Sequence, residues 1–239
     1  LWGRRLEQNP ERFIKLAQRA NDDDIRVRFQ VALAVGVTDD PRGAQLLTAI
    51  ALRDGNDRWC TAAILTSAEK RSGAIIAGLL KNDTFIRRGE TARIGLIRDL
   101  ATVVGSRGDI DELASLMQTL TSTDQQGVWW QTAALSGLAT GLPRHRGSLG
   151  RTSLPALVAR PPARLSQSID RVRQLLQRTH NVALNRDLPA VDRLAAIELL
   201  GYQPFNKASA AFEKLLATDQ PLDVQLACVV ALRRTANEG

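Results

Sequence analysis

The stretch Asp24–Gly36 reads DIRVRFQVALAVG, and it decides the fold class. Its apolar residues Val27, Val31, Ala34 and Val35 recur at spacings of four, seven and eight residues from the first. That spacing places all four side chains on one face of an α-helix. The sequence therefore predicts an amphipathic helix here, whose apolar face must be buried against another element.

A second amphipathic helix is predicted directly after the first. Asp39 and Asp40 precede Pro41, which is the usual order of an N-cap residue followed by proline at the first helical position. The apolar pattern then runs to a turn at Asp54 and Gly55. Its members are Ala44, Leu46, Leu47, Ile50, Ala51 and Leu52. Together the two segments form a helix–turn–helix pair.

The pair recurs along the chain. Cys60 lies 33 residues after Val27, and Arg193 lies 165 residues, five times 33, after Arg28. A helix–turn–helix period of about 33 residues is typical of helical solenoids. The later helices are predicted at Arg58–Leu65, Ala74–Leu80, Ile86–Val104, Asp109–Leu120, Val128–Leu138, Asp192–Gly201 and from Asp223 onward.

We therefore predict an all-α fold: a right-handed α-solenoid of about six HEAT-like helix pairs, with residues 1–239 as a single domain. Residues 10–20 resemble a second helix that lacks its first, and residues 224–234 resemble a first helix that lacks its second. Since solenoids need polar caps, we expect neighbouring segments to cover both ends. The chain starts with Leu1 rather than Met, so we expect it to be a fragment of a longer protein.

The composition suits a helical protein with a basic surface. There are 32 basic and 25 acidic residues, which give a net charge of +7. Excess positive charge favours anionic partners such as nucleic acid, although a solvated helical surface shows the same balance without one. No apolar run approaches the ~18 residues of a membrane span. Cys60 and Cys228 lie in Ala-rich helical stretches several repeats apart, so we expect buried thiols rather than a disulfide.

The line DIRVRFQVALAVG…DDPRG resembles HEAT repeats of the bacterial, lyase-like type, in which the first helix carries a Val-Arg pair and the second follows Asp-Pro. Several stretches also resemble the HEAT segment of planctomycete-type multidomain proteins, where a membrane-bound dehydrogenase domain precedes that segment and a c-type cytochrome follows it. The matching stretches are Val27–Gly36, Asp57–Ala68, Trp129–Leu142, Asp192–Gly201 and Asp223–Leu232.

The resemblance implies a spacer or docking module that acts in the periplasm or otherwise outside the cytoplasm. Its partners would then include the flanking domains of the same polypeptide. The haem attachment motif Cys-x-x-Cys-His of that family is missing, because both cysteines are isolated and neither is followed by His. The resemblance therefore assigns no catalytic residue and no cofactor to this chain.

A basic segment interrupts the repeat where a second helix should begin. No Asp or Glu occurs between Asp124 and Asp170, and prolines and glycines break the helical pattern. We predict a long, exposed, basic insertion around residues 143–164. A functional loop and a plain solvated loop both fit this pattern. Its arginines are Arg144, Arg146, Arg151, Arg160 and Arg164.

Trp129 and Trp130 are adjacent on the helix just before that insertion. Neighbouring helical side chains point about 100° apart, so two interpretations are open. One indole is partly exposed beside the basic loop as a binding hot spot, or, as we favour, both pack under the insertion. The predicted partner-binding residues are therefore Trp129, Trp130, Arg144, Arg146, Arg151, Arg160 and Arg164.

Other polar groups favour structural roles. Asp22, Asp23 and Asp24 precede a helix, so we interpret them as an N-cap cluster rather than a cation site. The two histidines, His145 and His180, have no Cys, Asp or Glu at ligand spacing, so no metal site is predicted. Three arginines near helix starts each follow an aspartate, which predicts Asp–Arg contacts at the turns between repeats. These pairs are Asp24 with Arg28, Asp57 with Arg58, and Asp192 with Arg193.

The sequence thus favours a non-catalytic scaffold or docking domain that contacts a protein or a neighbouring domain. The alternative is DNA binding through a basic concave HEAT surface, which would fall steeply with salt. No aromatic–basic interleaving runs along the repeats, which counts against it. A third possibility, a HEAT-fold DNA glycosylase or lyase, needs a carboxylate in an aromatic-lined pocket, and no such cluster is found. The distribution of charge on the folded surface distinguishes the first two.

Overall fold

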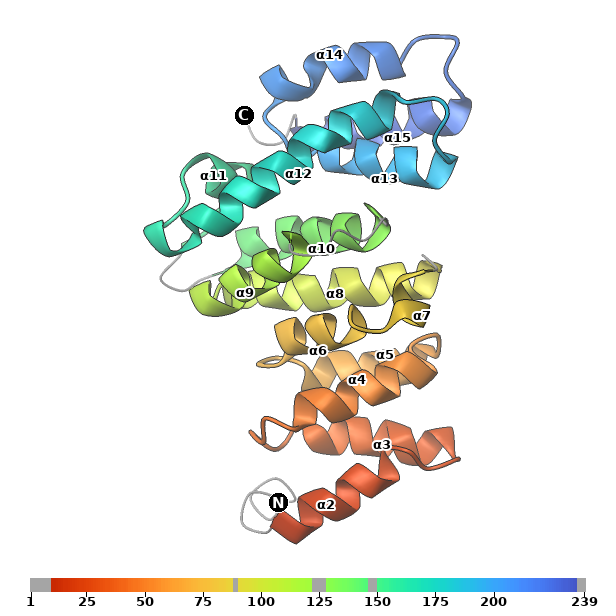
Figure 1. Cartoon of the computed structure of the whole chain (residues 1–239), viewed down its shortest axis with the longest axis vertical. Helices are drawn as coiled ribbons and strands as arrows, with labels where there is room; N and C mark the ends of the chain where they lie inside the picture. Colours follow the sequence, from red (N-terminus) through yellow and green to blue (C-terminus); the bar gives the residue numbers. More distant parts are fainter. Residues whose placement is uncertain (1–9, 88–89, 122–127, 146–149, 236–239) are drawn as a thin grey trace.

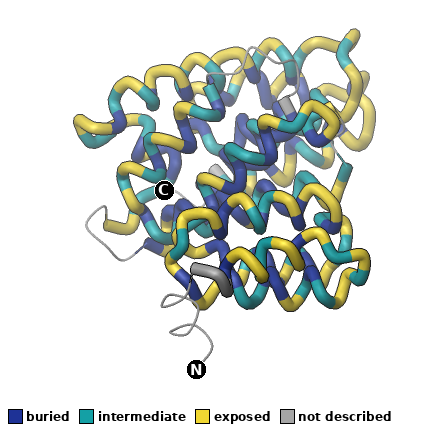
Figure 2. The backbone as a smooth tube through the Cα atoms, turned by 60° about the horizontal axis from the view of Figure 1, so that its bottom comes forward, coloured by how far each residue is buried: buried dark blue, intermediate teal, exposed yellow. Residues whose placement is uncertain are grey.

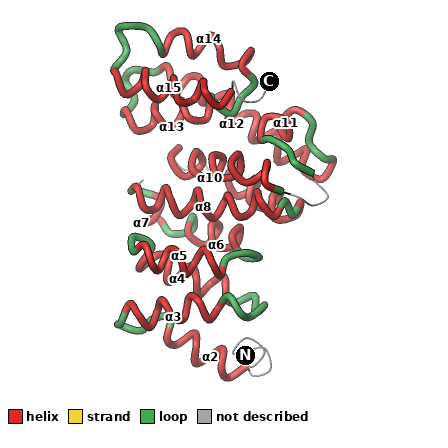
Figure 3. The backbone as a smooth tube through the Cα atoms, turned by 180° about the vertical axis from the view of Figure 1, so that it is seen from behind, coloured by secondary structure: helices red, strands yellow, loops and turns green. Residues whose placement is uncertain are grey.

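The computed structural model describes residues 10–87, 90–121, 128–145 and 150–235. Within these ranges the regular structure consists of α-helices and two short 3-10 helices, with no strand (Figures 1 and 3). This confirms the predicted all-α class. None of the helices in the described ranges has the length and apolar character needed to cross a membrane.

The helices form two layers, and the chain alternates between them. Layer A consists of α3 (Ile25–Val35), α5 (Arg58–Ser67), α8 (Thr91–Arg107), α10 (Val128–Gly141), α13 (Ala190–Leu200) and α15 (Leu222–Thr235). Layer B consists of α4 (Gly43–Asp54), α6 (Ser72–Leu79), α9 (Ile110–Thr121), α12 (Ser166–Leu184) and α14 (Phe205–Leu215). Consecutive helices within each layer contact one another, so each layer is a stack along the long axis of the molecule (Figure 1). The first described helix, α2 (Pro10–Arg19), packs on α3.

The predicted helices are present, with two corrections at their starts. The predicted helix Ile86–Val104 is divided, because Asn82 caps a separate one-turn helix, α7 (Asp83–Ile86), and α8 begins only at Thr91. Pro41 is not the first residue of α4, which starts at Gly43. The Asp40 side chain accepts hydrogen bonds from Arg42 in the turn instead. Helices α12 and α14 are additional to the predicted set.

The hydrophobic core lies between the two layers (Figure 2). A large cluster fills the space from α3 to α12, and a smaller one joins α12, α13, α14 and α15. Both cysteines are buried within the stack as free thiols, as predicted. The layers therefore depend on each other, because neither stack has a second partner for its apolar faces.

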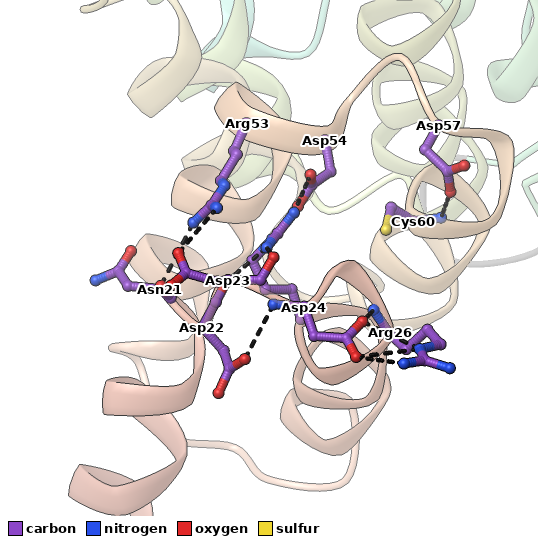
Figure 4. A network of polar contacts seen from close by, with 10 residues as sticks. Asn21, Asp22, Asp23, Asp24, Arg26, Arg53, Asp54, Asp57 and Cys60 are labelled. Atoms are coloured by element: carbon purple, nitrogen blue, oxygen red, sulfur yellow. Dashed lines mark hydrogen bonds and ion pairs between the residues drawn. The ribbon is translucent and has the colours of Figure 1, made fainter.

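A buried ion pair ties the first three described helices together. The guanidinium of Arg28 donates two hydrogen bonds to the carboxylate of Asp54, each 2.6 Å long, and these side chains are only 5% and 6% exposed. Arg28 also donates to the backbone carbonyls of Asp22 and Asp23 at 2.5 and 3.0 Å (Figure 4). One side chain of α3 thus joins the end of α4 to the turn after α2.

The same device recurs further along layer A. Buried Arg193 of α13 donates to the carbonyl of Ala183 at 3.1 Å and to the side chain of Gln220 at 2.9 Å. Arg93 of α8 donates to the carbonyls of Thr84 and Phe85 at 3.0 and 3.1 Å. In each case an arginine near the start of a layer A helix satisfies carbonyls at the end of the preceding segment.

The predicted pairing of each arginine with its adjacent aspartate is therefore wrong. Asp24 is the N-cap of α3 and pairs with Arg26 rather than Arg28, which holds the pKa of Asp24 at about 2. Arg58 is exposed and stacks on the ring of Trp59. Asp24 confirms the N-cap interpretation of the aspartate cluster, because its carboxylate accepts a hydrogen bond from the backbone N–H of Arg26. The backbone N–H of Asp24 in turn donates to the carboxylate of Asp22 (Figure 4).

The ion pair between Arg28 and Asp54 gives a direct stability prediction. Asp54→Ala leaves a buried guanidinium without its counter-ion, so we expect the free energy of unfolding to fall by about 3–5 kcal/mol. Urea unfolding followed by circular dichroism measures the change. The matched control is Lys70→Ala, which breaks the exposed pair with Asp39 and should leave the urea midpoint nearly unchanged. Equal effects of the two substitutions would contradict this account.

Candidate functional site: a groove over helix α10

Both tryptophans predicted as contact residues are buried, so the interpretation of an exposed hot spot is wrong and the alternative of two packed indoles is right about their burial. Trp130 is 1% exposed and Trp129 is 8% exposed. Helix α10 lies between α8 and α13 in layer A, so two side chains pointing 100° apart both meet protein. The Trp129 ring lies 6.0 Å from that of Phe85, and its Nε1–H donates to the carbonyl of Ile86 at 3.0 Å.

The described parts of the basic insertion, residues 143–145 and 150–164, expose their arginines but also contribute buried side chains to the core. Arg144, Arg151, Arg160 and Arg164 are exposed, and Arg146 lies outside the described residues. The segment forms two 3-10 turns, η1 (Leu142–Arg144) and η2 (Ala163–Leu165), and the short helix α11 (Leu154–Ala159). Leu154, Leu157 and Leu165 are buried in the core, and Arg164 pairs with Asp111 of α9 at 3.0 Å. The segment as a whole is therefore not the free loop that the composition predicts.

The structure does not bring the predicted contact residues together. The tryptophans lie in the first turn of α10, whereas the insertion begins at the C-terminal end of that helix. A helix of 14 residues is about 20 Å long, and this length separates the two groups. Adjacency in the sequence therefore does not become adjacency in space.

Glycines line the contact between helices α10 and α8. A Cβ atom on Gly137 would overlap the backbone carbonyl of Arg98, and one on Gly141 would overlap that of Thr102. A Cβ atom on Gly105 would come within 3.0 Å of the backbone of α10. Only glycine permits this close approach of two helix backbones. The two helices therefore pack backbone against backbone, and the α10 side chains Thr132 and Ala133 lie in a recess where they are almost fully buried.

That recess forms a groove of about 400 Å³, here called the α10 groove. Every residue that lines it belongs to layer A, so it opens on the side of the molecule away from layer B. The lining residues are Ile94 and Arg98 of α8, Trp129, Thr132 and Ala133 of α10, Val191, Leu194, Ala195 and Glu198 of α13, and Asp223, Ala227, Val230, Ala231 and Arg234 of α15.

A polar cluster lies at one end of the α10 groove. The Glu198 carboxylate accepts a hydrogen bond from the Ser136 hydroxyl at 2.7 Å and pairs with Arg98 at 3.4 Å and Arg234 at 3.3 Å. The Ser136 hydroxyl also lies 3.0 Å from the phenol of Tyr202, whose pKa is raised by burial. The Arg234 guanidinium lies 5.0 Å from the centre of the Tyr202 ring. These contacts connect α8, α10, α13 and α15.

This cluster has the composition of a hydrolytic site but not the access. Ser136 is 2% exposed, and it does not line the groove. Its hydroxyl is hydrogen-bonded between two side chains rather than presented to a substrate. We assign Ser136 a structural role, because its hydrogen bond holds Glu198 between the two arginines.

An exposed tryptophan, Trp59, was not among the residues predicted from the sequence to contact a partner. Trp59 is 62% exposed in the first turn of α5, and it lines a second apolar pocket of about 330 Å³ between α3 and α5, here called the Trp59 pocket. Its other lining residues are Ile25, Arg26, Phe29, Asp57 and Cys60. The clue was its position one residue before the buried face of α5, because a step of 100° turns it outward.

The two thiols are buried, and their burial changes their acidity. Burial raises the pKa of both Cys60 and Cys228 to about 11. Among the described residues, no group of three or more His, Cys, Asp or Glu side chains is placed to hold a metal ion. Two depressions on the described surface face solvent and have an apolar lining suited to binding, the α10 groove and the Trp59 pocket.

The glycine contact predicts opposite effects of one substitution at two positions. Gly137→Ala places a methyl group on the carbonyl of Arg98, so we expect a loss of roughly 1–3 kcal/mol in the free energy of unfolding. Gly95→Ala, in the middle of α8, meets no atom within 4 Å and should stabilise the protein by about 0.5–1 kcal/mol. Urea midpoints of the two variants test this. Stabilisation by both would show that α8 and α10 are not in close contact.

The burial of Cys60 and Cys228 predicts slow alkylation of both thiols in the native protein. At pH 8 a thiol with a pKa of about 11 is ionised in only about one molecule in a thousand, so iodoacetamide should label the native protein at least about 100-fold more slowly than free cysteine. In urea both thiols should react at the ordinary rate. Rapid labelling of either cysteine in the native state would contradict the described burial.

No known family model, curated protein or solved structure matches this chain. The function therefore has to be inferred from the chemistry of its own surface. The α10 groove and the Trp59 pocket, both on layer A, are the features from which we infer it.

Proposed function

We propose that this chain is a non-catalytic docking domain that binds a segment of another protein on the surface of layer A. The observation that supports the proposal is the pair of apolar depressions, the α10 groove and the Trp59 pocket, both lined by layer A residues only. An exposed tryptophan beside an apolar pocket is typical of the residues that carry binding energy in protein interfaces. Binding would follow from surface complementarity.

We further propose that the stack is a right-handed α-solenoid of HEAT-like helix pairs. Two features support a repeat beyond the sequence spacing. Gly36 at the end of α3 would meet Ser67 of α5 if it carried a Cβ atom, and Gly201, 165 residues later, would meet Ala231 of α15 in the same way. The buried arginines Arg28 and Arg193 have the same separation. A solenoid would give the docking domain its long continuous layer A surface.

The sequence resemblance suggests where the partners are found. If the chain is the HEAT segment of a dehydrogenase–cytochrome protein, its partners include flanking domains of the same polypeptide, outside the cytoplasm. The support for this part of the proposal is the set of matching stretches given above. An intramolecular partner would be held at high effective concentration, so even a modest groove affinity would suffice.

The charges of layer A favour protein docking over DNA binding. Acids and bases alternate on this surface, in the pairs Arg26–Asp24, Arg93–Glu90, Arg98–Glu198 and Arg234–Glu198. A DNA-binding surface needs a continuous row of unpaired bases that neutralise several phosphates. The two depressions are instead mainly apolar, which suits side chains of a protein.

A selection from a displayed library of unrestricted 12-residue peptides tests the proposal. We expect the immobilised chain to enrich peptides whose binding falls about tenfold or more with Val230→Ser in the α10 groove or Trp59→Ser in the Trp59 pocket, because each substitution removes apolar contact area. Both side chains are more than half exposed, so neither change should affect folding. Fluorescence anisotropy of the enriched peptides gives the dissociation constants.

The matched control is Leu216→Ser, an exposed apolar residue at the end of α14 in layer B. It should leave peptide binding unchanged. A 20-base-pair DNA duplex serves as the competing ligand, with binding measured between 50 and 200 mM salt, roughly the range over which phosphate contacts lose most of their affinity. Tight duplex binding that persists in both layer A variants, without peptide enrichment, would overturn the docking proposal.

A further inference from the structure

We propose that the α10 groove takes a peptide segment of the partner that carries an apolar side chain beside a carboxylate, and that Arg98 and Arg234 bind this carboxylate. The inference rests on the proposed docking function and names the chemistry of its partner. Apolar residues line most of the groove, and the two arginines stand at one end of it. An acidic residue placed next to an apolar anchor would engage both parts at once.

The charge at that end is unbalanced. Arg98 and Arg234 share the single carboxylate of Glu198, at 3.4 and 3.3 Å, whereas the arginine–carboxylate pair Arg107–Glu112 is 2.6 Å long. Within the groove, two guanidinium groups face one carboxylate, which leaves one positive charge over. The neighbouring carboxylate of Asp99 also acts on Arg98, but Asp99 does not line the groove. A carboxylate from a partner would neutralise the remaining charge by accepting hydrogen bonds from the exposed parts of the two guanidinium groups.

The two guanidinium groups are accessible and already held in place. The Arg98 and Arg234 side chains are 40% and 37% exposed. Arg234 lies over the ring of Tyr202, and Glu198 is fixed by the hydroxyl of Ser136. A site that is ordered before binding loses less side-chain entropy when the ligand arrives.

The other acid of the groove does not oppose this charge. Asp223 lies at the start of α15, eleven residues before Arg234. Eleven residues of helix span about 16 Å. At physiological salt the screening length is about 8 Å, so Asp223 scarcely affects a carboxylate bound between the arginines. The groove is therefore basic at one end and acidic at the other.

The lining of the groove favours a peptide over other anionic ligands. A nucleic acid strand would meet only two cations here, already partly neutralised, and an apolar floor of Trp129 and Ala133. An amphiphilic small molecule such as a fatty acid would need an enclosed apolar chamber. Val191 and Val230 at the walls are more than half exposed, so the groove is open to the surface. An open apolar groove with a charged end fits a segment of protein chain.

A peptide array on the full chain tests the inference. Capped 12-residue peptides carry one central Leu with Glu, Gln or Lys at each neighbouring position in turn. We expect the Glu series to bind about tenfold or more tighter than the Gln series, and the Lys series to bind weakest. In Arg98→Gln/Arg234→Gln the preference for Glu should disappear. Arg233→Gln, which removes one charge from an exposed neighbour outside the groove, is the matched control and should keep it.

A second variant separates a binding role from a structural one. Glu198→Gln keeps the shape of the side chain and its contact with Ser136 but removes the competing carboxylate, so we expect Glu peptides to bind several-fold more tightly. A merely structural cluster would give unchanged or weaker binding. Circular dichroism confirms that each variant is folded.

The outcomes also separate this inference from the proposed function. If Val230→Ser weakens all peptides while the arginine variants change nothing, docking stands and the carboxylate inference is overturned. If no peptide depends on Val230 or Trp59, the docking proposal itself fails. Binding of a 12-nucleotide single strand in place of peptides, lost in Arg98→Gln/Arg234→Gln, would assign the groove to nucleic acid and overturn the inference.

Discussion

Each amphipathic helix of this chain carries its apolar side chains on one face, and another helix has to bury that face. The described layer helices are 8 to 19 residues long, and isolated helices of such lengths are marginal in water. Their stability therefore comes from packing of layer A on layer B. Buried arginines such as Arg28 and Arg193 reinforce this packing, because each joins consecutive helices at the turns where backbone carbonyls would otherwise lack donors. The two-layer stack and its long surface follow from this constraint.

Helix α10 is the exception from which the candidate site arises. It is buried on nearly all sides, and its glycines let it sit against the backbone of α8. Side chains of α8, α13 and α15 surround the buried side chains of α10, and the space between them is the groove. Where α10 meets α13, a polar cluster built around Glu198 replaces apolar packing. The groove therefore has an apolar floor and a charged end.

The sequence predicts the all-α class and those helices whose apolar residues recur on one face. It does not predict the orientation of helices that lack such a pattern. Helix α3 is predictable because its apolar residues fall on one face. Helix α10 shows no clear apolar face, so its pattern could not decide between the exposed and the buried interpretation of the two tryptophans. The partner of Arg28 is 26 residues away, and nothing local distinguishes Asp54 from the nearer Asp24. Trp59 was identifiable, since its place beside the buried face of α5 turns it outward.

The candidate site combines residues from four helices that are spread over more than a hundred residues, from Ile94 to Arg234, and sequence spacing cannot join them.

The central claim is that this surface of layer A receives a partner. Hydrogen exchange of the chain with and without a library-selected peptide tests it most directly. The account predicts slower exchange in α8, α10, α13 and α15, or around Trp59 in α3 and α5, with α9, α12 and α14 unchanged. Protection confined to layer B, or to the basic segment at residues 150–165, would contradict it.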